Sequence, residues 1–358
     1  MTSQQASMDG TSAFVDWEFA KATGRRLVPA GPRVTPSQAA AVVNELRGAA
    51  RRARQPVADT ARMHAPDDAG PVLVVDRPNW IDANVDSMSD MLEPVIEAML
   101  NKRAEHRQSP VVTAIGGKVT GGEAGGLLAY LASRVLGQYD IAPAGTPRLL
   151  LVAPNILATE TEMGVDPSDF RLWVCLHEEA HRLQFTAVPW LRQHLLDAAR
   201  ALAVDLVPDV DHLGERLQDI ARRLPDVLRS GGPGLTELVA TPEQRAAMAR
   251  LTAVMSLLEG HADVVTDDVG PSVVPSVAQI RAKFQQRRAG QGSVDRLLRR
   301  LIGLEAKMRQ YRDGAVFVRA VIDRVGVDGF NRVWDSPQTL PLPEDIEDPQ
   351  RWVARVHG

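Results

Sequence analysis

The residues best able to do chemistry are His177-Glu178-Glu179-Ala180-His181, which form a His-Glu-x-x-His pattern. Residues i and i+4 lie about one helical turn apart, so both imidazoles would leave the same face of a helix and could bind one metal ion. Glu178 follows the first histidine and could reach a water molecule on that metal. The spacing is typical of a helix that binds zinc and activates water for hydrolysis.

The residues around this pattern predict a helix. Asp166 can cap its N-terminus, Pro167 suits the first helical position, and Asp169 places a carboxylate at the third. Apolar residues recur at helical spacing from Phe170 onward, and Pro189 sets the latest end. The alternative is that two histidines share a helix face by coincidence and bind no metal. The helix signals favour the metal site.

Two imidazoles leave a catalytic zinc one protein ligand short, because such sites have three protein ligands and an open position. Gln184 and Ala187 stand where a His-x-x-Gly-x-x-His pattern would have its glycine and third histidine, so that class is excluded. A glutamate on a later helix is the other common source. Glu259 offers one, on a helix that should begin at a capping box of Thr241 and Gln244 and end at Gly270-Pro271.

His261 competes with Glu259 for the role of third ligand. The two residues point about 200° apart on a helix, so they can hardly bind the same metal. His261 shares its helix face with apolar residues, so its other interpretation is a partly buried histidine. Asp263 lies one turn after Glu259 and could accept the second ring N–H of a zinc-bound histidine.

The pattern at Glu178, followed by Glu259 and Asp263, resembles the gluzincin arrangement of thermolysin-like peptidases. That resemblance implies that the late glutamate binds zinc and the aspartate supports a ligand histidine. The wider sequence, from about Asp16 to Trp352, resembles a family of zincin-like metallohydrolases of actinobacteria that is often labelled as associated with deazaflavin coenzyme biosynthesis. The label implies no substrate. The matching stretches are Val74–Ile81, Val135–Asp140, Leu151–Asn155, Phe170–Phe185, Pro189–Leu191, the Glu259 segment and Lys307–Phe317.

We therefore expect a Zn²⁺-dependent hydrolase that cleaves a peptide or a small amide, with His177, His181 and Glu259 as ligands. Glu178 would be the general base. His261 and Tyr311 are candidates by residue type for stabilising the oxyanion in the transition state, although packing in a helix is the favoured interpretation of Tyr311. Two alternatives stay open: a zinc-binding scaffold without peptidase activity, and a metallohydrolase of a non-peptide amide metabolite.

Composition narrows the class of protein. The chain has 358 residues, of which 44% are hydrophobic. Its net charge of −4 argues against nucleic acid or an anionic membrane as a partner. Its single cysteine, Cys175, excludes an internal disulfide framework and is expected in the core. No stretch reads as a secretory signal or a membrane span, so cytoplasm is the expected location. The sequence does not indicate an oligomeric state.

The expected fold is mainly α with a small β component (α+β), a zincin-like metallopeptidase fold. Residues 1–12 are expected to be disordered, 13–145 to form a helical N-terminal region, and 146–358 to form the catalytic region, packed separately or as one compact unit. Helices are expected over 36–54, 84–101, 123–136, 191–204, 210–228, 276–289 and 293–325, and strands over 72–76 and 149–153. The second strand could be a substrate-binding sheet edge or an ordinary core strand. Gly116–Gly122, residues 55–69 and the Pro-rich tail are expected to be irregular.

Overall fold

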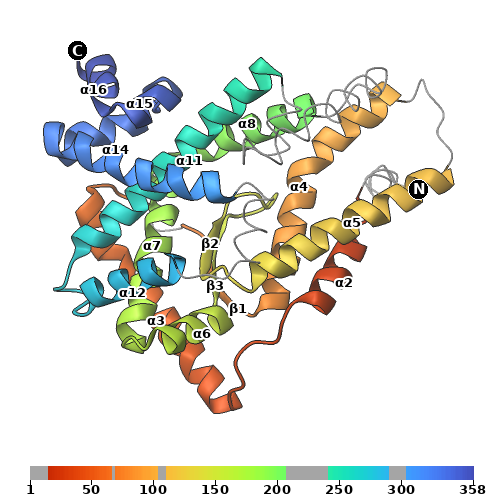
Figure 1. The fold of residues 1–358 in the computed structure, drawn as a ribbon, viewed down its shortest axis with the longest axis horizontal. Helices are drawn as coiled ribbons and strands as arrows, with labels where there is room; N and C mark the ends of the chain where they lie inside the picture. Colours follow the sequence, from red (N-terminus) through yellow and green to blue (C-terminus); the bar gives the residue numbers. More distant parts are fainter. Residues whose placement is uncertain (1–14, 67–68, 104–109, 207–240, 290–303) are drawn as a thin grey trace. The chain divides into compact units, whose positions relative to one another are not determined.

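The computed structural model describes residues 15–66, 69–103, 110–206, 241–289 and 304–358 (Figure 1). It confirms a mainly helical chain with a small sheet. The expected disorder of residues 1–12 and the expected helix over 210–228 lie outside the described residues. The elements are α2 (Trp17–Leu27), α3 (Pro36–Ala61), β1 (Val72–Val75), α4 (Arg77–Arg103), α5 (Pro110–Ala132), β2 (Gly137–Asp140), β3 (Arg148–Val152), α6 (Ala153–Met163), α7 (Pro167–Ala187), α8 (Leu191–Leu206), α11 (Pro242–Val269), α12 (Val277–Ala289), α14 (Leu304–Phe330), the 3-10 turns η2 (Asn331–Trp334) and η3 (Pro337–Thr339), α15 (Pro343–Glu347) and α16 (Pro349–His357).

The chain divides into two compact units. The first comprises Met1–Ala187 and Val269–Arg281, and it holds the sheet together with the helices up to α7. The second comprises Val188–Asp268 and Ala282–Gly358 and is built from helices and 3-10 turns. Among the described residues, no helix has both the length and the apolar character that crossing a bilayer requires.

The three-stranded sheet has the order β1-β3-β2, with β1 parallel and β2 antiparallel to β3. The strand expected near residues 149–153 is confirmed as β3, and Leu149 to Val152 are fully buried. An uninterrupted apolar run is what a strand covered on both faces requires. The interpretation of this strand as a sheet edge is wrong, because β3 pairs on both sides. The antiparallel edge strand is β2.

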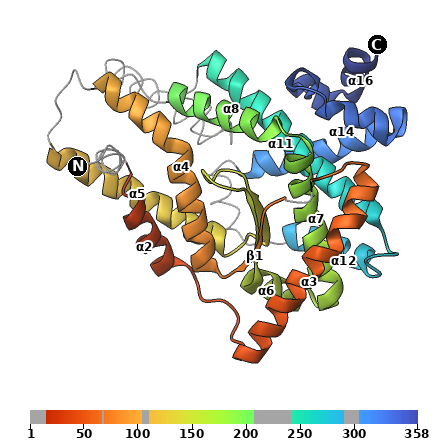
Figure 2. The same ribbon diagram turned by 180° about the vertical axis from the view of Figure 1, so that it is seen from behind.

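Successive residues of β2 face α7 and α4 in alternation. Gly137 lies against Glu178 of α7, and the Tyr139 ring stacks on Phe185 of the same helix at 5.8 Å between ring centroids. Gln138 and Asp140 point the other way, where the Gln138 amide donates to Asn84 of α4 at 2.9 Å. Asp140 accepts from Ser87 of α4 at 2.8 Å. The sheet is therefore flanked by α7 and α4, as both ribbon views show (Figures 1 and 2).

The glycine-rich stretch before residue 123 is helical, so the expectation of a loop there is wrong. It forms most of α5, which packs along α2. A Cβ at Gly121 would lie 2.5 Å from the carbonyl oxygen of Asp16, and one at Gly125 would lie 2.5 Å from that of Ala20. The glycines thus let two helix backbones approach closely, a use that outweighs their low helix propensity.

The expectation of irregular structure around two groups of prolines, after residue 55 and in the tail, is also wrong. Helix α3 continues through Pro56 to Ala61, because Val57 and Ala61 beyond the proline are buried. The tail forms α15 and α16, with Pro343 and Pro349 in their first turns, where proline is well tolerated. Trp352 of α16 is fully buried, and its indole N–H donates to the Thr339 carbonyl at 2.8 Å. The tail is therefore part of a core.

Candidate metal centre

Helix α7 carries the His-Glu-x-x-His pattern and starts as the sequence predicts. The Asp166 side chain accepts from the backbone N–H of Asp169 at 2.9 Å. Asp169 in turn accepts from the backbone N–H and hydroxyl of Ser276, at 2.8 and 2.6 Å. The N-terminus of the helix is thus capped by one aspartate and held to a distant segment by another.

Helix α7 carries the two histidines on one face and packs on α3 with the opposite face. With about 100° per residue, His177 and His181 point within about 40° of each other, whereas Glu179 and Arg182 point roughly opposite. That opposite side packs on α3, where the Cys175 thiol is 3.8 Å from the Leu46 carbonyl. The predicted core position of Cys175 is confirmed, since the residue is fully buried.

Glu179 and Arg182 form a buried ion pair on the α3 side of α7. Arg182 Nε donates to Glu179 Oε2 at 2.7 Å, and a second guanidinium nitrogen bonds the other carboxylate oxygen. Burial raises the pKa of the Glu179 carboxyl, while Arg182 and Arg54 act against that rise. The pair is internal to α7 and lies on the side of the helix away from the imidazoles.

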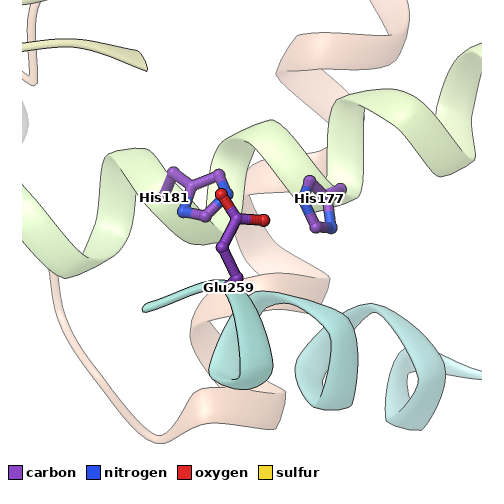
Figure 3. Close-up of side chains that lie close together, drawn as sticks. All are labelled: His177, His181 and Glu259. Carbon is purple, nitrogen blue, oxygen red and sulfur yellow. The ribbon is translucent and has the colours of Figure 1, made fainter. Parts of the chain in front are cut away.

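The ligand atoms of His177, His181 and Glu259 all lie within 4.8 Å of one another. Figure 3 shows the imidazoles projecting from α7 and the carboxylate from α11. Two nitrogens and one carboxylate oxygen are the donor set of many catalytic zinc sites, where bonds of about 2.0–2.2 Å keep neighbouring ligands within roughly 4 Å. The residues therefore fit a zinc ion after a small closing of the side chains.

One residue close to the imidazoles was not predicted as part of the site. Gln184 is fully buried, and its Oε1 lies 3.1 Å from Nδ1 of His181. With the proton on Nδ1, His181 donates to Gln184 and keeps Nε2 free to bind a metal. The sequence contained the signal, since Gln184 lies three residues after His181 and shares its face.

Helix α11 presents Glu259 and also begins and ends as predicted. Thr241 and Gln244 form the capping box, with bonds of 2.8 and 3.2 Å, and Gly270 follows the helix with a φ of 73°. Glu259 and Asp263 are both half-buried. Asp263 does not belong to the three-residue ligand group found among the described residues.

His261 is enclosed by aromatic rings. It is 2% exposed, stacks on Phe330 at 5.5 Å and meets Trp334 edge-on at 5.4 Å. It too lies outside the ligand group of the described residues. These contacts agree with the interpretation of His261 as a buried histidine. The backbone of Tyr311 belongs to α14, and its side chain lies outside the described residues.

Comparison with known proteins identifies the family. The model of the zincin-like metallopeptidase family matches residues 15–353. A crystal structure of a candidate hydrolase with a novel fold, from Chloroflexus aurantiacus, is 31% identical, covers 96% of this chain and 99% of its own, and superposes with a TM-score of 0.66. A search of curated proteins finds no match. With a ligand group suited to a metal and a family match over nearly its whole length, the chain belongs to the zincin-like metallopeptidases, a family of zinc hydrolases.

Proposed function

We propose that this protein is a zinc-dependent peptidase in which His177, His181 and Glu259 bind the metal and Glu178 is the general base. The observation that carries the proposal is the grouping of these three ligand atoms within 4.8 Å, together with a buried glutamate, Glu178, directly after His177 on α7. A structural zinc usually has four protein ligands and needs no general base. Three ligands and Glu178 fit catalysis better.

The proposed chemistry divides between metal and protein. Zinc, when bound, supplies a Lewis acid that polarises a carbonyl and lowers the pKa of water towards ~7. Glu178 accepts the proton of the attacking water at a carboxylate oxygen and can deliver it to the leaving amine. Gln184 holds the His181 ring through Nδ1. Asp263 is proposed to support a ligand histidine in the same way.

Two residues are candidates for stabilising the oxyanion. His261 and Tyr311 keep their candidacy by residue type alone. The enclosure of His261 between Phe330 and Trp334 favours packing for that residue.

The edge strand β2 supports a peptide as the substrate. The Val152 N–H donates to the Leu136 carbonyl at 2.8 Å, and antiparallel strands alternate between bonded and non-bonded pairs. The main-chain groups of Gly137 and Tyr139 therefore point away from β3. No other described strand pairs with that edge. An extended peptide could bind there by backbone pairing.

The Glu178→Gln variant tests this function. It should keep zinc, because Glu178 is not a ligand, and lose hydrolysis of a fluorogenic peptide library by at least about 100-fold, the typical contribution of a general base. A wild type that hydrolyses only amides in a metabolite panel would indicate the non-peptide alternative. A zinc-loaded wild type inactive on both panels would contradict the enzyme and favour the scaffold.

A further inference from the structure

The position of the general base depends on a residue that has no side chain. We propose that Gly137, the first residue of β2, is a positioning residue that determines where the Glu178 carboxylate can lie. This inference rests on the proposed function and deepens it, because it adds a residue to the same site. Gly137 would touch neither substrate nor metal through a side chain and would act through Glu178.

The contact between the two residues is unusually close. A Cβ built on Gly137 would lie 2.5 Å from Cγ, 2.6 Å from Cδ and 2.8 Å from Oε1 of Glu178. Contacts below 3.0 Å are essentially never made by a real Cβ. The three nearest atoms all belong to this one side chain, so the carboxylate lies directly over the strand backbone. Any larger residue would occupy the space of the general base.

The glycine is not required by its backbone conformation. Gly137 is not among the glycines with a positive φ, so an alanine could adopt its main-chain geometry. Many close glycines allow two backbones to approach, as Gly125 does in α5. Gly137 differs because its neighbour is the reactive end of a side chain. What Gly137 provides is room for the Glu178 side chain above the strand.

A methyl group at this position should displace the carboxylate and leave the frame in place. The β2 backbone is held by its pairing with β3, and α7 is held by its packing on α3 and by the Asp169–Ser276 hydrogen bonds. The Glu178 side chain has rotatable bonds and is the softest partner in the contact. A displacement of about 1 Å at a catalytic group can cost roughly 100-fold in rate.

Crystal structures of zinc-loaded wild type and Gly137→Ala variant test the geometry without measuring activity. We expect the Glu178 Cδ to move by about 1 Å or more, with the imidazoles and zinc content unchanged. The matched control is Gly145→Ala, in the connection between β2 and β3, because nothing lies within 4 Å of a Cβ there. An unmoved carboxylate in the Gly137→Ala variant would overturn the proposal.

Kinetics on a peptide substrate of the wild type then test the consequence. In Gly137→Ala, kcat should fall about 100-fold with KM nearly unchanged, since the carboxylate acts on the reacting water rather than in binding. Gly145→Ala should keep wild-type values. A displaced carboxylate with full kcat would refute a positioning role. An inactive wild type would instead contradict the proposed function, and the crystal structures would still decide whether Gly137 fixes the carboxylate.

If the Gly137→Ala variant does not fold, a second pair of variants still tests the proposal. Gly137→Ala/Glu178→Ala should unfold at the same temperature as Glu178→Ala, within about 2 °C, because the nearest atoms to the new methyl group are gone. If the double variant also failed to fold, the conflict would lie with other atoms. The assignment of Gly137 to Glu178 would then be wrong.

Discussion

Replacing Arg182 by methionine should destabilise the protein far more than the loss of one ion pair usually does. The Arg182 and Glu179 side chains are 3% and 4% exposed. Removing one partner of such a pair leaves a charge buried without compensation, which costs about 3–5 kcal/mol. An exposed pair with the same i,i+3 spacing, Glu18 and Lys21, has its glutamate 85% exposed. Glu18→Gln should cost at most about 0.5 kcal/mol.

The assay is urea unfolding of the zinc-free protein, and it includes the double variant Glu179→Leu/Arg182→Met. Apolar replacements of similar size should restore most of the free energy of unfolding or exceed the wild-type value. One guanidinium nitrogen, Nη1 of Arg182, is buried with no hydrogen-bond partner among the described residues, so the wild-type pair already carries a cost. Equal losses in the single and double variants would refute this account.

The pH dependence gives a second check of the same variant. Burial already raises the pKa of Glu179 above its ordinary value of 4.5, and loss of Arg182 should raise it further. A carboxyl whose pKa is higher in the folded state contributes stability below its unfolded pKa and loses it as pH rises through the folded pKa. The deficit of Arg182→Met should therefore be small near pH 4.5 and grow towards pH 8. A deficit independent of pH would contradict the buried carboxylate as its cause.

Two further predictions concern the packing of the first unit. Gly125→Val should lower the free energy of unfolding by about 1–3 kcal/mol in urea titrations, because its Cβ would meet the Ala20 carbonyl. Gly126→Ala, with open space at its Cβ, should not destabilise the protein. Burial raises the pKa of the Cys175 thiol, so at pH 8 native protein should show almost no reaction with a disulfide reagent and one thiol per chain after unfolding; rapid reaction of the native protein would contradict the buried position.

Local chemistry made much of the candidate site predictable. The histidines, the base and the helix cap lie within 16 residues of each other, from Asp166 to His181, and their geometry follows from helical spacing alone. Glu259 was found because a catalytic zinc needs a third ligand and its helix carries clear start and stop signals. The separation of His261 from the ligand group follows from the same helical angle.

Features fixed by tertiary packing could not be predicted in this way. The order β1-β3-β2 depends on which strands pair, so the sequence leaves open whether β3 is an edge strand or a core strand. The helical form of α5 depends on the close approach of α2, which outweighs the propensity of its glycines. Gly137 left no signal because its contribution is the absence of atoms beside Glu178. The Pro-rich composition of the tail predicts irregular structure, whereas Pro343 and Pro349 each begin a helix.

The zinc content of the purified protein, measured by elemental mass spectrometry beside Glu259→Ala, tests the central claim most directly. We expect about one zinc per wild-type chain and a sharp loss in Glu259→Ala, because the metal would lose one of three protein ligands. Glu243→Ala, an exposed glutamate of the same helix, should keep its zinc. A wild type that binds no zinc even after zinc is added back, or a Glu259→Ala variant that binds it as tightly as wild type, would contradict the three-ligand site.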